Sequence, residues 1–581
     1  MSRPARGPAL VYGSLSVVLV MVLGTLALTT SAPPPPAIAE FAPEAVQQIK
    51  NAPAEQQQVA AQRGPGSGPG GAGGPSASAS AAAAASASAS PSAPGQISRV
   101  ARANSCVGSP PRQTEDPQSP PCVAFYQGKL LGATSRGVTA SEIRIVIPCN
   151  PANENASPAV RCTNDGALDI KAFTAFFNER FQFYGRKLTV IRYKITTPLT
   201  VTSMIRDAQA VEALKPFAVM DYLGGTADKL GTSAIFFREL SRRKIVNISG
   251  LQLEAGTSNV TQAELQSQAP YGWTYQPTAD MVLAQIGDLI CTSLVKRKPY
   301  FSDIYQGVGE KTPTIRKFGI AVPATPSSSA NLGPTPLTRR LDSCKAPYQT
   351  QNFEPAQEGA SKGATELISK FHSDGVTTVV PLSTNMKGDL HFPASQLRYY
   401  PEWITSNIYG ADAMTNAVNI SGYTEENRRM FGIRSDNKAK IQVRSYNYQA
   451  VKEYDSNYTC CDRRGFYQAF MLLSGGIQMA GPNLTPETFQ QALYDTSYPG
   501  NNQASQAPDW HSRVDFGPGD HTMQSDFQFQ FVNQQEFNND FAQRQGTYCA
   551  VERGIRFGPG ELKRPLTFFN GGAGLGSAPC M

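Results

Sequence analysis

The chain has 581 residues and a formal net charge of +7, and charged residues make up 17% of it. This length is too great for one ordinary hydrophobic core, so we expect two or more folded units. The excess of positive charge is modest and scattered, with no stretch that interleaves Lys or Arg with aromatic residues, which argues against nucleic acid as a partner.

The first 39 residues predict a membrane anchor or a signal segment. Arg3 and Arg6 precede an uncharged apolar run at residues 9–28, about as long as the 20 residues that a membrane-spanning helix needs. The two arginines predict a cytoplasmic N-terminus and an exported remainder. The sequence AIA at residues 37–39 leaves a cleaved signal as the alternative. We therefore expect a chain that is anchored to the plasma membrane by its N-terminal helix, or secreted after cleavage.

Residues 40–98 predict a disordered linker. The stretch 64–95 consists almost entirely of Ala, Ser, Gly and Pro, and it offers almost nothing to bury. Such a segment cannot offset the entropy that ordering it would cost. The folded part of the chain is therefore expected from about residue 99 onward.

Ten cysteines agree with export, because an even number in an exported chain favours disulfides. Two pairs bracket short loops, and a third pair is proposed from the remaining cysteines. The expected pairs are Cys106–Cys122, Cys149–Cys162 and Cys291–Cys344. Of the remaining cysteines we expect the vicinal Cys460 and Cys461 to bond to separate partners. No CxxC motif and only four histidines are present, none near a cysteine in sequence, so we expect no metal and no cofactor.

Strands and helices alternate at short intervals through the first part of the folded region. Apolar strands are predicted at 142–148, 187–193, 217–221 and 245–248, with helices between them. The same rhythm restarts after residue 280, with strands at 318–326, 348–354 and 376–384. Such alternation is typical of parallel α/β sheets, and its repetition predicts two lobes with a ligand cleft between them.

Four stretches, in this order, resemble the type I periplasmic binding proteins, and most closely the branched-chain amino-acid binding proteins of ABC importers. They are "GVTASEIRIVIPCNP", "FYGRKLTVIRYK", "FAVMDYLGGTADKLGTSAIFFRELSRRKIVNISG" and "YGWTYQPTADMVLAQIGDLI". The stretch "PPCVAF…GATSRGVTASEI" is further similar to a cysteine-bracketed segment of actinobacterial members. The resemblance covers roughly residues 120–560. It implies a two-lobe α/β fold, with parallel sheets flanked by helices and a cleft between the lobes.

The expected organisation follows from both the rhythm and the resemblance. It comprises an anchor or signal at 1–39, a linker at 40–98, a cysteine-bracketed segment at 99–136, the first part of lobe 1 at 137–275, the first part of lobe 2 at 276–407, return segments that complete both lobes at 408–560, and a tail at 561–581.

A double-glycine turn is the first candidate for a ligand site. Gly224 and Gly225 follow an apolar strand, and Thr226 stands where a helix begins. Free N–H groups at a helix N-terminus suit an anion or a carbonyl, and glycines let a ligand approach the backbone closely. The alternative is a plain tight turn with Thr226 as the N-cap. The resemblance favours ligand binding, because the family uses this turn for its ligand.

Further candidates come from the family topology, which directs strand ends toward the cleft. Tyr271, Trp273 and Tyr275 either close over an apolar ligand or pack at the hinge. Asn407 corresponds to a position where amino-acid binders hold an acidic residue, and its neutrality puts an ordinary α-amino acid in question. The remaining candidates are Asn150, Ser249, Gly250, Tyr275, Thr325, Ser383, Thr384 and Asn407.

These features predict an extracytoplasmic solute-binding protein for a small polar or amphipathic, amino-acid-like ligand. An ABC permease is the expected partner. A membrane-anchored sensor or cell-surface interaction domain is the alternative, which the long linker also suits. No enzyme is expected, because the chain lacks GxSxG, HExxH and P-loop motifs. Asp520 and His521 have the residue types of half a catalytic triad, but without a nucleophile motif we expect a solvated loop pair.

Overall fold

The structure of the chain is a computed structural model that describes most of the region after residue 105. The described residues are 106–109, 111–129, 131–151, 162, 164–221, 232–249, 260–302, 315–324, 334–354, 363–383, 386–406, 424–435, 445–458, 464–496, 512–537, 545–550 and 552–570. The expected anchor at 1–39 and linker at 40–98 lie outside them. In the described part of the chain, no helix has both the length and the apolar character needed to cross a bilayer.

The first sheet has five strands, and every pairing in it is parallel. The order across the sheet is β2-β1-β3-β4-β5. Its strands are β1 (Glu142–Cys149), β2 (Lys187–Lys194), β3 (Ala218–Asp221), β4 (Val246–Ser249) and β5 (Gly272–Thr274). They alternate with helices along the chain, so each strand returns to the same edge of the sheet, as parallel pairing requires.

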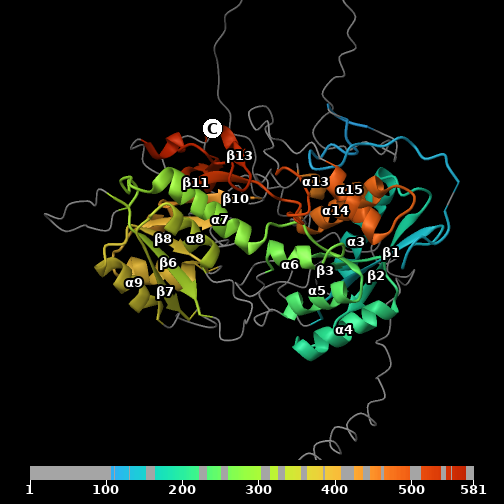
Figure 1. Ribbon diagram of the computed structural model, residues 1–581, viewed down its shortest axis with the longest axis horizontal. Helices are drawn as coiled ribbons and strands as arrows, with labels where there is room; N and C mark the ends of the chain where they lie inside the picture. The colour runs from blue at the N-terminus through green and yellow to red at the C-terminus, as the bar shows by residue number, and fades with distance from the viewer. Residues whose placement is uncertain are drawn as a thin grey trace, which may run out of the picture. The chain divides into compact units, whose positions relative to one another are not determined.

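Both faces of the first sheet are apolar and covered by helices. Ile145 points to one face and Val146 to the other, as strand geometry dictates, and each lies in a separate apolar cluster. The first face packs against α3 (Asn164–Arg180), α13 (Tyr446–Tyr454), α14 (Arg464–Ala480) and α15 (Pro486–Asp495), and the second against α4 (Val201–Ala213) and α5 (Thr232–Arg242). The short helix α6 (Gln262–Ser267) precedes β5. Figure 1 shows α14, drawn in orange, beside the much earlier α3.

The second sheet repeats this winding and then extends it. Its order is β7-β6-β8-β9-β10-β11-β12, and the first five strands are parallel. The strands are β6 (Phe318–Pro323), β7 (Tyr348–Phe353), β8 (Thr378–Pro381), β9 (Glu402–Ser406), β10 (Met430–Arg434), β11 (Phe527–Phe537), β12 (Gln545–Ala550) and β13 (Arg556–Phe557). The last three join in antiparallel fashion, β13 through β11.

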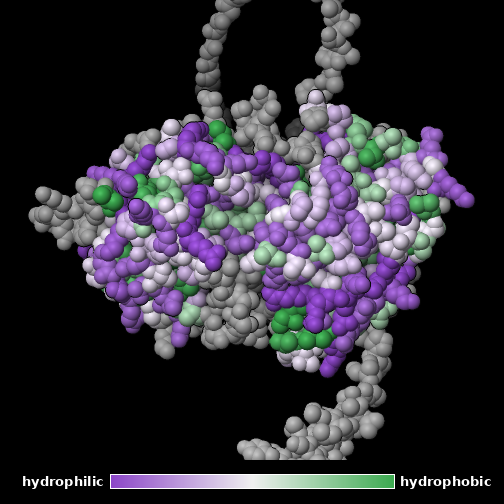
Figure 2. Space-filling view, viewed as in Figure 1, coloured by the Kyte–Doolittle hydropathy of each residue, from purple (hydrophilic) through white to green (hydrophobic). Residues whose placement is uncertain are grey.

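Helices also cover both faces of the second sheet. One face packs with α7 (Ala279–Leu289), its π-helical extension η3 (Ile290–Leu294), α8 (Thr335–Ser343) and the 3₁₀ turn η8 (Thr567–Asn570), and the other with α9 (Ala364–Ser373), the π-helical turn η4 (Lys387–His391) and α10 (Phe392–Gln396). The remaining short helices are α12 (Thr424–Asn427) and the 3₁₀ turn η7 (Glu552–Gly554). Hydrophilic residues dominate the face of the molecule drawn in Figure 2.

The α/β class with parallel sheets flanked by helices, expected from the sequence, is confirmed. Each strand predicted between 142 and 384 overlaps a strand of the structure. The segment 271–275, interpreted as a crossover, contains the edge strand β5, and its Thr274 then forms a parallel bridge with Thr522. The backbone bonds Thr274 N–H to His521 O, 3.1 Å, and Met523 N–H to Thr274 O, 2.8 Å, hold the two segments together.

The long helix α14 illustrates how closely the first lobe is packed. A Cβ atom on Gly476 would lie 2.3 Å from the ring of Phe489 on α15. Such a contact is far shorter than van der Waals packing permits, so only glycine lets α14 and α15 approach in this way. Phe489 is itself fully buried in the cluster that covers the first sheet.

The three expected disulfides are present. Their Cα–Cα distances are 5.6 Å for Cys106–Cys122, 5.1 Å for Cys149–Cys162 and 5.7 Å for Cys291–Cys344. Cys549 is also disulfide-bonded. Cys460 and Cys461 lie outside the described residues, so their separate pairing stays a prediction.

Candidate functional site

The candidate residues that the structure describes all lie just at or after the carboxyl ends of strands. Asn150 follows β1, Ser249 ends β4, Tyr275 follows β5, and Ser383 comes two residues after β8. Because all strands of the first sheet are parallel, its three candidates share one edge. Ser383 lies at the matching edge of the second sheet. The other candidates lie outside the described residues: Gly224, Gly225, Thr226, Gly250, Thr325, Thr384 and Asn407.

Ser249 has the most informative environment at the edge of the first sheet. The strand register places it between Asp221 of β3 and Thr274 of β5. Its side chain is buried, with 1% of the residue exposed, and its Oγ has no hydrogen-bond partner among the residues that the structure describes. A buried hydroxyl without a partner is unfavourable, so this edge holds hydrogen-bonding capacity that the described residues do not use.

The aromatic residues near β5 pack in the core. Trp273 is fully buried and stacks on the His521 ring, with centroids 4.3 Å apart and planes at 7°. Its edges meet Phe489 and Phe516 in T-shaped contacts. Tyr275 is buried in the same apolar cluster, and Tyr271 is partly buried against it. This burial favours the hinge-packing alternative over closure on a ligand for Trp273.

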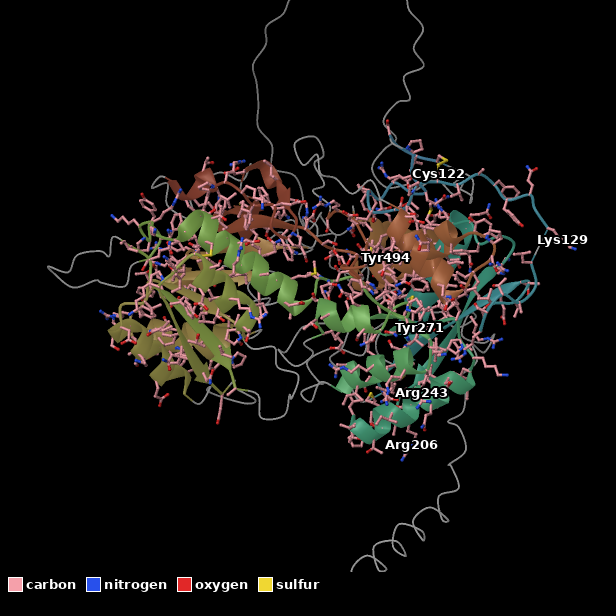
Figure 3. All side chains as sticks on the ribbon, viewed as in Figure 1. Cys122, Lys129, Arg206, Arg243, Tyr271 and Tyr494 are labelled. Carbon is pink, nitrogen blue, oxygen red and sulfur yellow. A yellow bond between two sulfur atoms is a disulfide. The ribbon has the colours of Figure 1, made fainter. Side chains whose placement is uncertain are left out.

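The Asp520-His521 pair differs from expectation, because the histidine is buried and not solvated. The His521 Nδ1 lies 3.0 Å from the Gly272 carbonyl oxygen, and its Nε2 is paired with the hydroxyl of Tyr494 on α15. Tyr494 is labelled beside the orange helices in Figure 3. Since Nδ1 donates to the carbonyl, Nε2 accepts from the tyrosine. Burial lowers the pKa of His521, so the ring is held neutral. The prediction of a solvated pair was wrong because the segment 521–523 runs alongside β5 in place of looping into water.

Asp520 is oriented by its neighbours and not by the histidine. Its Oδ1 accepts from the Thr522 N–H at 2.9 Å and from the Gln262 amide at 3.3 Å. Burial raises the pKa of this carboxyl group. The pair therefore serves as a structural connector between the segment 520–523 and β5, and nothing in its contacts arranges a nucleophile.

Gln262, on the first turn of α6, was missed by the sequence reasoning. Its side-chain oxygen accepts from the His521 N–H at 3.2 Å, and its backbone N–H lies 3.2 Å from the Asp280 Oδ2. Gln262 thus links α6 to the start of α7 through its backbone N–H and to the segment 520–522 through its side chain. In the sequence it is an ordinary polar residue after the N-cap Thr261, and no local pattern marks it.

The edge of the second sheet is satisfied differently. Ser383 is buried, and its Oγ donates to the Asp389 Oδ2 at 2.6 Å. Asp389 lies in the π-helical turn η4 and is fully buried. The sequence predicted Ser383 but not its partner, because the six residues between them obscure the spatial pairing.

Comparisons with known proteins give matches among solved structures only. No protein-family model matches the chain. No curated protein matches it either. The chain is similar to a leucine-, isoleucine-, valine-, threonine- and alanine-binding protein from Brucella ovis in its closed conformation, with 11% identity, a TM-score of 0.47, and coverage of 73% of this chain and 97% of that one.

Two further solved structures are similar at the same level. One is an ABC-transporter solute-binding protein from R. palustris in complex with 4-hydroxybenzoate, with 10% identity, a TM-score of 0.47, and coverage of 72% and 98%. The other is an ABC-transporter substrate-binding protein from Aeropyrum pernix, with 11% identity, a TM-score of 0.46, and coverage of 73% and 97%. At this level of likeness, function has to be argued from the chain's own residues.

Proposed function

We propose that this chain is an extracytoplasmic solute-binding protein that holds a small polar or amphipathic molecule between two lobes. One observation carries the proposal: both sheets wind in the same order, with the first strand between the second and third. In open α/β sheets of this order, ligands bind outside the carboxyl ends of the strands where the winding reverses direction. Those positions are β1/β3 in the first sheet and β6/β8 in the second.

Polar residues at these edges support the assignment. Asn150, Ser249 and Tyr275 contribute from the first sheet, and Ser383 from the second. The unpartnered Ser249 hydroxyl is the clearest of them, because a ligand group that donates or accepts a hydrogen bond would remove the cost of its burial. The remaining proposed contacts come from the family resemblance: Gly224, Gly225, Thr226, Gly250, Thr325, Thr384 and Asn407.

The proposed partner is an ABC permease of the branched-chain amino-acid class, and the proposed location is the outer face of the plasma membrane. The N-terminal apolar run at 9–28 would tether the protein, and the linker would give it reach. Binding should close the lobes around the crossover segments without making or breaking a covalent bond. A chain that binds its ligand yet never associates with a permease would instead be a surface sensor.

Isothermal calorimetry on the full chain tests the proposal. The ligand panel contains leucine, isoleucine, valine and 4-hydroxybenzoate. We expect at least one compound to bind, and Ser249→Ala to weaken that binding about tenfold, since one hydrogen bond of about 1.4 kcal/mol corresponds to that factor. The exposed Ser267→Ala, in the same lobe, is the matched control and should bind as the parent does.

Two outcomes would contradict the proposal. If Ser249→Ala and Ser267→Ala weakened binding equally, the ligand would not bind at the carboxyl edge that contains Ser249. If mass spectrometry of the ligand after incubation with the protein detected a chemically converted product, the protein would be an enzyme and not a solute-binding protein.

A further inference from the structure

Residues 527–531 of the strand β11 alternate strictly between phenylalanine and glutamine. Phe527, Phe529 and Phe531 point into the apolar cluster beneath α7. Gln528 and Gln530 therefore point to the opposite face, where Val532 lies against Trp403 and Met430. In an antiparallel strand with this pattern, the polar face is ordinarily the one that water covers.

Both glutamines are nevertheless buried. Gln528 is 0% exposed and Gln530 is 3% exposed. Within the described part of the chain, neither the Nε2 nor the Oε1 of Gln528 has a hydrogen-bond partner, and the Oε1 of Gln530 has none. Burying an amide without a hydrogen-bond partner is unfavourable, because the group loses its bonds to water and gains none in return. Two such amides, two residues apart on one face, are therefore a sign of a missing partner.

The register shows what surrounds them. Gln530 is opposite Gly432 of β10, which is in turn opposite Thr405 of β9, and Gln528 is opposite Arg434. A Cβ at position 432 would lie 1.8 Å from the Thr405 carbonyl oxygen, so the middle of this row has to remain without a side chain.

The hydroxyl of Tyr548, from β12, completes the surroundings. Burial raises the pKa of Tyr548 well above its usual value, and the smaller lowering effects of the nearby Thr405 and Arg434 do not offset it. Its neutral phenol can therefore both donate and accept. Arg434 has an interaction of its own and is not counted as a free donor.

We propose that this polar face, formed by Gln528, Gln530, Thr405 and Tyr548, binds a small uncharged molecule that carries both hydrogen-bond donors and acceptors. The two glutamine oxygens require donors, which a carboxylate cannot supply. The Nε2 of Gln528 requires an acceptor, which a simple ammonium cannot supply. Carboxamides and short polyols satisfy both demands, and the burial of the glutamines limits the ligand to a few heavy atoms. This polar face belongs to the second sheet, whereas Ser249 belongs to the first, and the observations on this face do not rest on the proposed transport function.

Ligand-observed NMR titrations on the full chain test the inference with three probes. Propionamide and glycerol represent the two sources of the chemistry, and propionate is the charged counterpart of propionamide. We expect the parent to bind propionamide, glycerol or both, and not propionate. The double variant Gln528→Met/Gln530→Met should lose at least tenfold in affinity, while the exposed Gln266→Met should not change it.

A second measurement guards against a merely structural effect. Urea unfolding should find the double variant at least as stable as the parent, because apolar side chains replace amides that have no partners. The Ser249→Ala variant should bind the probes as the parent does, which separates this site from the strand-edge site.

Four outcomes would overturn the inference. Propionate binding as tightly as propionamide would show recognition of charge. Loss of binding in Ser249→Ala would place the probes at the strand edge. If neither propionamide nor glycerol bound, the polar face would not be a site for small uncharged molecules with donors and acceptors. A double variant less stable than the parent would show that the glutamine amides already have hydrogen-bond partners, such as ordered water, without a ligand.

Discussion

The two sheets share one winding order but treat their carboxyl edges differently. At the first edge, the buried Ser249 hydroxyl has no partner. At the second, Ser383 donates to the fully buried Asp389 at 2.6 Å. The same residue type at corresponding edges is therefore held differently: one hydroxyl makes no hydrogen bond within the described residues, and the other bonds to the turn that follows β8.

The strands of the two sheets also differ in how they hold charge. In the second sheet, Arg316 and Glu402 form a bidentate pair, with Nε–Oε2 at 2.7 Å and Nη2–Oε1 at 2.9 Å, and both side chains are 0% exposed. In the first sheet, Arg144 and Glu142 of β1 are 2.6 Å apart but about 30% exposed. Burial, and not distance, separates an ion pair that the fold depends on from one that it does not.

The largest expected loss of stability comes from removing one charge of the buried Arg316–Glu402 pair. Glu402→Gln leaves the Arg316 guanidinium buried without a counter-charge, and it also weakens the bond that the Thr378 hydroxyl donates. We expect a loss of about 3–5 kcal/mol in the free energy of unfolding, measured in urea. The matched Glu142→Gln should cost less than about 1 kcal/mol, because its pair is partly solvated.

A double variant sharpens the same prediction. Replacing both members, as Arg316→Met with Glu402→Leu, removes both buried charges together and should recover much of the lost stability. If the double variant were as unstable as Glu402→Gln alone, the uncompensated charge would not be the cause.

The next effect concerns Ser383. Ser383→Ala removes a donor from a buried carboxylate, so we expect thermal or urea unfolding to show a loss of about 1–3 kcal/mol. Ser373→Ala, where the hydroxyl donates to a carbonyl at an exposed helix end, is the matched control and should stay within about 0.5 kcal/mol. Equal effects in the two variants would contradict a special role for the pair with Asp389.

The sequence predicted the parallel part of the fold because its signals are local. Strands such as 142–148 are short apolar runs, and the helices between them show a helical period that leads directly to α3 and α9. Two of the three disulfides, Cys106–Cys122 and Cys149–Cys162, also followed from short spacings in the chain. In these cases, residues close in the sequence carry the information that fixes the element.

The remainder depends on contacts between distant segments. The helix α14 is buried along most of its length, and its two consecutive glycines, which disfavour helices, disguise it in the sequence. Likewise, burial of His521 depends on Trp273, which lies far away in the sequence. At the site, Ser249 and Ser383 were predicted by topology, but only the structure distinguishes the hydroxyl without a partner from the one with Asp389.

A smaller effect tests a difference between the helices that follow the second strand of each sheet. The helix α4 begins with a capping box in which the Thr200 hydroxyl accepts from the Ser203 N–H at 3.0 Å. The helix α9 begins at Gly363 without a side-chain cap. Thr200→Ala should cost about 1 kcal/mol in urea unfolding, and Thr200→Ser should retain most of it, because serine can make the same bond. Equal losses in both variants would point to packing of the threonine methyl group.

The smallest expected change in stability belongs to Ser249→Ala, and it returns to the contrast between the two edges. Since the Oγ of Ser249 has no partner, its removal deletes a buried polar atom without breaking a bond. The free energy of unfolding without ligand should therefore stay unchanged or rise slightly, unlike that of Ser383→Ala. In the presence of a ligand identified by calorimetry, the parent should gain more stability than the variant, because tighter binding to the folded state shifts unfolding further. A variant that loses as much stability as Ser383→Ala without ligand would show that Ser249 already has a partner within the fold, and the two edges would then be alike.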